Sequence, residues 1–240
     1  MLAIPFGLPR REIWREAPGR FVSWLLPESC RFCSAPGAAI CDDCHRELPR
    51  LPADRCSWCA LPVNADGDCP VCSIEAPSYD YTFCPFVYTH PLATAISAWK
   101  FHAGLDWTRP LAQAWLRTWT TESLPARPDA LLPVPAHSAR LAERGYNQAA
   151  LLAWHWARAY RIPLRDVLRR TRNTPHQVGG SRDQRRANLQ SAFTLRGKLP
   201  AHIALVDDVM TTGSTAEALA QLLKAQGVQR VDLWILARAL

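Results

Sequence analysis

The sequence of 240 residues contains no apolar run of about 18 residues, the length that a helix needs to cross a membrane. Its first residues, MLAIPFGLPRREIWREAPGR, place proline and charged residues where a secretory signal peptide needs an uninterrupted apolar core. From these two absences we expect a soluble cytoplasmic protein without a membrane span.

Two common phosphate-binding patterns are also missing. The GK[ST] element of a Walker loop does not occur, and neither does the GxGxxG fingerprint of dinucleotide-binding folds. Any phosphate site in this chain must therefore be of another kind.

Charge and composition favour a folded chain with anionic partners. Lys and Arg total 28 against 21 Asp and Glu, which gives a formal net charge of +7. Such an excess attracts phosphates and nucleic acid by long-range electrostatics. Hydrophobic residues make up 48% of the chain and include ten Trp, so the chain can bury a sizeable core. Its length allows one α/β domain and a small additional module.

Nine cysteines in a chain without a secretion signal indicate metal binding rather than disulfides. Eight of them form four CxxC pairs: Cys30 and Cys33, Cys41 and Cys44, Cys56 and Cys59, Cys69 and Cys72. Two such pairs can surround one Zn²⁺ tetrahedrally and close it to substrate, so we predict two structural zinc sites. Pairing block by block is the simpler assignment, and an interleaved one stays open. The ninth, Cys84, lies in an apolar segment and is expected to be a buried thiol.

Composition and hydrophobic pattern divide the chain into three parts. Residues 1–27 mix Arg with Trp, Phe and Leu at helical spacing and predict a short helix. Residues 28–76 are the cysteine-rich module. Residues 77–240 alternate strand-like and helical segments, which is typical of a central, mainly parallel sheet with helices on both faces. Helices are expected over 91–104, 110–120, 146–160 and 214–226, and strands at 128–135, 164–171, 191–195, 202–208 and 231–237.

The stretch IALVDDVMTTGST, residues 203–215, carries the most chemistry. A buried strand leading into a helix places the intervening loop at the carboxyl edge of the sheet, where such folds bind ligands. Hydroxyls of Thr211, Thr212, Ser214 and Thr215, with Gly213 between them, meet the helix N-terminus and favour a phosphate.

Two adjacent carboxylates precede this loop. Asp207 and Asp208 would repel a phosphate, so we expect them to accept hydrogen bonds from a neutral group such as a vicinal diol. A phosphate beside a diol describes a ribose 5-phosphate.

This stretch resembles the phosphoribosyl pyrophosphate (PRPP) motif of type I phosphoribosyltransferases. The segments AISAWKFHAG, LLPVPAHSARLAERGYNQAALLA and RRTRNTPHQVGGSRDQRRANLQSAF further resemble the ComF family (ComF/GntX-like) over residues 28–240. That resemblance implies a type I phosphoribosyltransferase fold behind an N-terminal double zinc-ribbon module.

The resemblance also implies roles for residues outside the 203–215 stretch. The turn of Val134, Pro135, Ala136 and His137 would be the pyrophosphate loop, and residues 171–188 a mobile hood over PRPP. Further residues are expected near these two elements: Arg140, Arg144, Asn147, Gln148, Gln177, Arg182, Arg186 and Asn188. Mg²⁺ would accompany PRPP. The family implies a part in DNA uptake, with single-stranded DNA and DNA-uptake helicase or channel proteins as partners, which could hold the protein at the inner face of the membrane.

Residues 165–198 contain nine Lys or Arg against two Asp, and so equal the formal excess of the whole chain. This segment is either a solvated basic face or a contact for a polyanion. Two functions stay open: a PRPP-binding protein of DNA uptake, or an active phosphoribosyltransferase whose nitrogen acceptor the sequence does not reveal.

Overall fold

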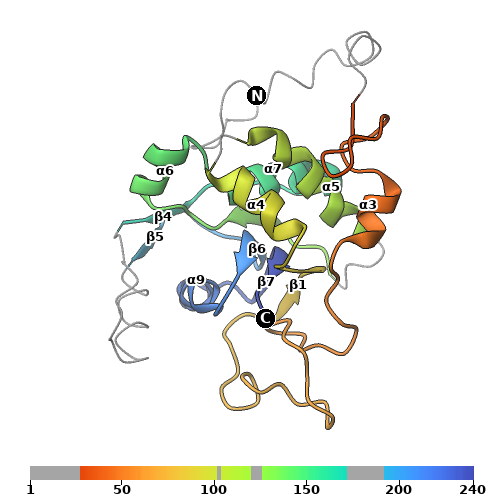
Figure 1. Cartoon of the computed structure of the whole chain (residues 1–240). Coiled ribbons are helices and arrows are strands. Elements are labelled where there is room, and N and C mark those ends of the chain that lie inside the picture. Colours follow the sequence, from red (N-terminus) through yellow and green to blue (C-terminus); the bar gives the residue numbers. More distant parts are fainter. Residues whose placement is uncertain (1–27, 102–103, 120–125, 172–191) are drawn as a thin grey trace.

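The structure is a computed structural model that describes residues 28–101, 104–119, 126–171 and 192–240 (Figure 1). The predicted N-terminal helix and all but the first residue of the predicted hood lie outside these residues.

A parallel sheet forms the centre of the molecule. It consists of β1 (Tyr81–Phe83), β2 (Phe86–Val87), β3 (Ala130–Pro133), β6 (His202–Met210) and β7 (Arg230–Arg238). The strand order is β1-β7-β6-β3, β2 also pairs with β7, and every pair is parallel. The predicted mainly parallel α/β sheet is confirmed.

Helices cover both faces of this sheet (Figure 1). On one face lie α4 (Leu92–Phe101), α5 (Thr108–Thr118), which follows the short helix η1 (Leu105–Trp107), and α7 (Gln148–Tyr160). The other face is covered by α9 (Ser214–Ala225). The apolar residues of the two faces form two separate clusters, and four tryptophans are fully buried: Trp99, Trp115, Trp156 and Trp234.

Smaller elements complete the fold. They are α3 (Asp42–Glu47), α6 (Ser138–Arg144) and an antiparallel pair of β4 (Leu168–Arg170) with β5 (Phe193–Leu195). The sequence pattern did not predict α6, which has no buried residue and hence no apolar stripe.

The strand β6 is longer than its apolar residues indicated. It continues to Met210 because Val209 and Met210 still pair with Ala237 and Arg238 of β7. Met210 is therefore a buried strand residue rather than the first residue of the hydroxyl loop. The loop proper begins at Thr211, directly beyond the edge of the sheet.

The cysteine-rich module contacts both apolar clusters. Ile40 and Leu48 belong to the cluster of α4, α5 and α7, whereas Cys56, Cys59, Cys69 and Cys72 belong to the cluster of α9. The prediction that Cys84 is a buried thiol is confirmed, since the residue is 0% exposed and burial raises its pKa to about 12.

Candidate functional site

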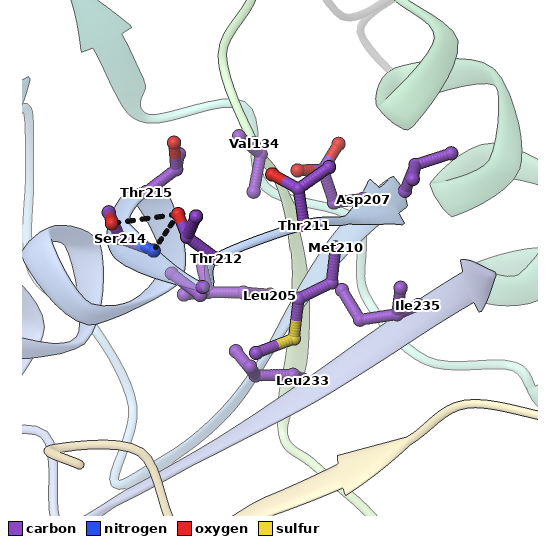
Figure 2. Close-up of a pocket in the computed structure, with 13 residues that line it drawn as sticks. Val134, Leu205, Asp207, Met210, Thr211, Thr212, Ser214, Thr215, Leu233 and Ile235 are labelled. Carbon is purple, nitrogen blue, oxygen red and sulfur yellow. Dashed lines mark hydrogen bonds between the residues drawn. The ribbon is translucent and has the colours of Figure 1, made fainter. Parts of the chain in front are cut away.

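A pocket opens at the carboxyl edge of the sheet, where β6 leads into α9 (Figure 2). Its empty volume is about 400 Å³, including the solvent at its mouth. Most of the predicted site residues of the 203–215 stretch line it. The lining residues are Val134, Leu205, Asp207, Val209, Met210, Thr211, Thr212, Gly213, Ser214, Thr215, Ala216, Leu233 and Ile235.

The hydroxyl loop has a backbone that requires glycine at its turn. Gly213 has a φ of +77°, and a Cβ at this position would lie 2.7 Å from Cε of Met210. The Thr212 and Ser214 hydroxyls hydrogen-bond each other at 2.8 Å (Figure 2). Since the N-terminal N–H groups of α9 lie at the same place, hydroxyl and amide donors converge on one point and can hold an anion.

The adjacent carboxylates have different surroundings, because neighbouring residues of a strand point to opposite faces. Asp207 lines the pocket, and its Oδ1 accepts a hydrogen bond from the Asp208 backbone N–H at 2.9 Å. Burial and the charge of Asp208 raise the pKa of Asp207 to about 7, and Lys100 partly offsets this. Neutral pH lies close to this pKa, so Asp207 is ionised in part of the molecules, and the ionised carboxylate can accept hydrogen bonds from a diol.

Asp208 is 8% exposed and is already ion-paired. Its Oδ2 lies 2.7 Å from Nζ of Lys100, and its Oδ1 accepts a hydrogen bond from the Val209 backbone N–H at 2.7 Å. Lys100 belongs to α4, and the sequence analysis missed it. The sequence did contain a signal for Lys100, since it lies four residues after the buried Ile96 and hence on the same side of the helix. A lysine beside apolar residues needs a carboxylate partner.

The predicted pyrophosphate loop follows β3, the strand next to β6. The Val134 N–H donates to the Val206 carbonyl at 2.9 Å, and Nδ2 of Asn147 donates to the Val134 carbonyl at 3.0 Å. His137 caps α6 by accepting a hydrogen bond at Nδ1 from the Ala139 N–H at 3.1 Å. The structure thus brings Val134 to the pocket and places Asn147 behind it, outside the pocket lining, while Pro135, Ala136 and His137 continue the loop toward α6.

Positive charge gathers beside this loop. Burial and the neighbouring Arg140 lower the pKa of Arg170, whereas Asp207 raises it, so these three charged groups share one neighbourhood. Two guanidinium groups within electrostatic range of one pocket carboxylate favour an anion in this neighbourhood, and arginine matches phosphate oxygens well. Arg170 was counted in the basic segment at the sequence level but was not proposed as a site residue.

Arg144 and Gln148 form a second polar group close to α4. Nη1 of Arg144 contacts Oε1 of Gln148 at 3.4 Å, and its guanidinium lies 4.8 Å from the ring centroid of Phe101. Phe101 is 59% exposed. The remaining predicted hood residues, Gln177, Arg182, Arg186 and Asn188, lie outside the part of the chain that the structure describes.

The eight CxxC cysteines form two tetrads, block by block. One tetrad is Cys30, Cys33, Cys41 and Cys44, the other Cys56, Cys59, Cys69 and Cys72, with all sulfur atoms of a tetrad within 4.8 Å of one another. Sulfurs of different CxxC pairs approach to 3.6 Å in the first tetrad and 3.5 Å in the second. Four sulfurs around Zn²⁺ at about 2.3 Å would lie about 3.8 Å apart, so both tetrads fit this metal.

Comparison with known proteins agrees with this arrangement. Residues 21–84 match the double zinc ribbon domain. Competence protein F of Haemophilus influenzae is 35% identical over 210 residues, covering 83% of this chain and 90% of that protein. DNA utilization protein YhgH of Escherichia coli (strain K12) is 33% identical over 231 residues, covering 90% of this chain and 99% of that protein.

Among solved structures, a purine phosphoribosyltransferase from Pyrococcus horikoshii Ot3 is similar at 18% sequence identity and a TM-score of 0.32, covering 61% of this chain and 75% of that one. Within the described residues, no helix is both long and apolar enough to span a bilayer.

Proposed function

The chain belongs to the ComF family, and on this premise we propose that it binds PRPP in the pocket of Figure 2 and acts in DNA uptake through contact with single-stranded DNA. The observation that carries the PRPP part is the convergence of the Thr211–Thr215 loop, the N-terminus of α9 and the Asp207 carboxylate on one pocket. We expect the protein to act in the cytoplasm.

In this proposal each part of the pocket takes one part of PRPP. The hydroxyls and N–H groups of the Thr211–Thr215 loop hold the 5-phosphate, and Asp207 accepts hydrogen bonds from the ribose hydroxyls. Asp208 keeps its ion pair with Lys100 and supports its neighbour from the other face of the strand. The pyrophosphate lies against the loop after β3, where Arg140 and Arg170 supply positive charge. Mg²⁺ is held mainly by the ligand's own oxygens.

The DNA part is supported by the names of the two relatives and by the charge near the pocket. Phe101 is 59% exposed, and the guanidinium of Arg144 lies 4.8 Å from the centroid of its ring, so a nucleic-acid strand can reach both from solvent. An exposed aromatic ring beside an arginine is suited to stack a base while a phosphate contacts the guanidinium group.

The two tetrads each hold one Zn²⁺ in this proposal. Four thiolates saturate the metal and leave no position for substrate, so the role of zinc is structural. A module of this size buries too little apolar surface to fold without such support.

The alternative function is transfer of ribose 5-phosphate to a nitrogen acceptor. In that reaction the acceptor nitrogen forms a bond to C1 of the ribose, the bond from C1 to pyrophosphate breaks, and pyrophosphate leaves with the electron pair. The observation that favours it is the positive charge of Arg140 and Arg170, which interact electrostatically with each other, because this positive charge would stabilise the departing pyrophosphate.

The test is ³¹P NMR of PRPP and Mg²⁺ with stoichiometric protein. We expect PRPP signals to be perturbed by the unaltered protein and by Asp80→Asn, a change of a partly exposed aspartate outside the pocket, but not by Asp207→Asn. Unperturbed signals with the unaltered protein would refute PRPP binding. Pyrophosphate release that depends on an added amine or base would establish the transferase.

The DNA part is tested separately by fluorescence anisotropy of labelled oligo-dT at increasing salt. Contacts with phosphates predict that affinity falls steeply as salt rises. Absent binding, or binding that salt does not change, would contradict this part alone.

A further inference from the structure

The two tetrads have different neighbours in the fold. The first contacts α5 and the turn before it: Phe32 packs edge-on against Trp107 with centroids 5.1 Å apart, and Nε2 of His45 hydrogen-bonds the Ala114 carbonyl at 2.9 Å. The second belongs to the same buried cluster as Met210, Leu219 and the α9 face of the sheet. Only the second tetrad therefore lies against the elements that form the pocket.

Arg238, at the end of β7, links the second tetrad to the hydroxyl loop. Its Nε donates to the carbonyl of Cys59, a tetrad residue, at 2.9 Å. Its Nη1 donates to the Met210 carbonyl at 2.9 Å and also to the Thr211 carbonyl. One side chain, 4% exposed, thus holds the backbone of a tetrad cysteine and the backbone at the start of the loop.

The positive charge of Arg238 is buried, and the second tetrad can supply the negative charge that balances it. Among the ion pairs of the described residues, none joins a carboxylate to Arg238, although the side chain is buried. A buried guanidinium needs a nearby counter-charge. Four thiolates around Zn²⁺ carry a net charge of about −2, which would supply it. A tetrad that holds Zn²⁺ and the Arg238 guanidinium would therefore stabilise each other.

Further contacts join the segment after the second tetrad to the loop and its helix. Ser78 donates to the Glu217 carboxylate in the first turn of α9 through its backbone N–H at 2.8 Å and its hydroxyl at 2.7 Å. The hydroxyl of the buried Tyr79 lies 3.4 Å from the position of a Cβ added at Gly213. The segment after the second tetrad thus contacts both Gly213 in the loop and the first turn of α9, the helix that follows the loop.

We infer that Arg238 is a positioning residue that couples metal binding at the second tetrad to phosphate binding by the Thr211–Thr215 loop, and that the first tetrad lacks this coupling. The phosphate half of this inference rests on the proposed function. Coupling between two sites is reciprocal, so a phosphate ligand must strengthen zinc binding at the second tetrad by the same factor by which zinc strengthens phosphate binding. Binding couplings are commonly about five- to 150-fold, and we expect about tenfold.

The first experiment compares Cys33→Ser with Cys69→Ser in the full chain, each removing one ligand from one tetrad. Amide hydrogen exchange of residues 210–217 is the readout, because it needs no ligand. We expect exchange in this segment to rise about tenfold in Cys69→Ser and to stay unchanged in Cys33→Ser. Equal exchange in the two variants would overturn the inference.

The second experiment keeps all cysteines and tests Arg238 itself, which also covers the case that Cys69→Ser fails to fold. Zinc removal by a chromogenic chelator is titrated to equilibrium with and without PRPP and Mg²⁺. For the unaltered protein, PRPP should raise the affinity for one of the two zinc ions about tenfold, and in Arg238→Gln this protection should disappear while the zinc affinity of the first tetrad is unchanged. Protection of both ions, or protection retained in Arg238→Gln, would refute the coupling.

The two experiments separate the inference from the proposed function. If exchange of residues 210–217 responds to Cys69→Ser but PRPP neither binds nor protects zinc, the structural coupling stands and PRPP binding is wrong. If PRPP binds but the second tetrad and Arg238 have no effect on loop exchange or zinc affinity, the proposed function stands and the inference is wrong.

Discussion

Replacement of Gly213 by alanine should weaken PRPP binding far more than its effect on folding would suggest. The residue has a φ of +77°, where an alanine costs roughly 1–2 kcal/mol. Its Cβ would also lie 2.7 Å from Cε of Met210, so that side chain must move. Because Met210 packs beneath the loop, its displacement shifts the Thr211–Thr215 donors away from the phosphate.

The size of the effect follows from the hydrogen bonds at risk. A hydrogen bond to a charged group contributes about 1.5–3 kcal/mol, so one misplaced donor should weaken PRPP binding roughly tenfold to a hundredfold. The strain in the folded chain should lower the unfolding midpoint by roughly 2–8 °C, at about 2–4 °C per kcal/mol for a chain of this size.

Gly227→Ala is the matched control for this variant. Its φ is +88°, and no atom lies within 4 Å of an added Cβ, so it carries the same backbone strain without a clash and outside the pocket. Calorimetric titration with PRPP and Mg²⁺, and thermal unfolding, would be measured for both variants. The reasoning is refuted if both lose the same stability and Gly213→Ala still binds PRPP with unchanged affinity.

The remaining predictions concern the carboxylates, the zinc ions and the exposed aromatic ring. Lys100→Met should lower the free energy of unfolding by about 3–5 kcal/mol, since it leaves the buried Asp208 without its cation, and the double variant with Asp208→Asn should recover part of this loss in a denaturant titration. The pKa of Asp207 rises from 3.8 to about 7 on folding, so the folded state holds the extra proton, and stability should fall as pH rises from about 4 to 7, a slope that Asp207→Asn should remove. Metal analysis should find two zinc ions per chain, and strong chelation should unfold the cysteine-rich module, as followed by circular dichroism; carefully prepared protein without zinc would contradict this. Phe101→Ala should weaken oligo-dT binding by about 1–3 kcal/mol in anisotropy titrations, whereas Ile74→Ala, another exposed apolar residue but on the second ribbon, should not.

The parts of the site that the sequence could predict are local in the chain. The strand, the hydroxyl loop and the helix over residues 203–226 are consecutive, so apolar runs and the αL glycine determine them with little help from the rest of the fold. The tetrads were predictable for the same reason, since each closes within 17 residues or fewer and ligand spacing largely fixes a zinc ribbon.

The contacts of the residues that support the site were not predictable, because their partners are distant in sequence; the position of Lys100 on its helix indicated a need for a carboxylate but not which one. Lys100 meets Asp208 only through the packing of α4 on the sheet, and a lysine at the end of a helix is usually solvated. In the sequence, Arg238 is simply the charged residue after the last apolar strand. Only the fold shows that its guanidinium donates to three backbone carbonyls from two other segments. Long-range polar contacts of this kind leave no period or spacing in the sequence.

The Lys100 ion pair also determines what the pocket can bind. Asp208 raises the pKa of Asp207 by charge repulsion, and Lys100 lowers it, so the cation on the far face of β6 keeps the pocket carboxylate close to ionisation at neutral pH. An ionised Asp207 accepts hydrogen bonds from a sugar diol, whereas a protonated one would instead donate a hydrogen bond to phosphate oxygens. The same pair of aspartates with no lysine behind it would therefore favour a second anion over a ribose. In the proposed function, selectivity for a ribose phosphate would thus depend on a side chain that does not line the pocket.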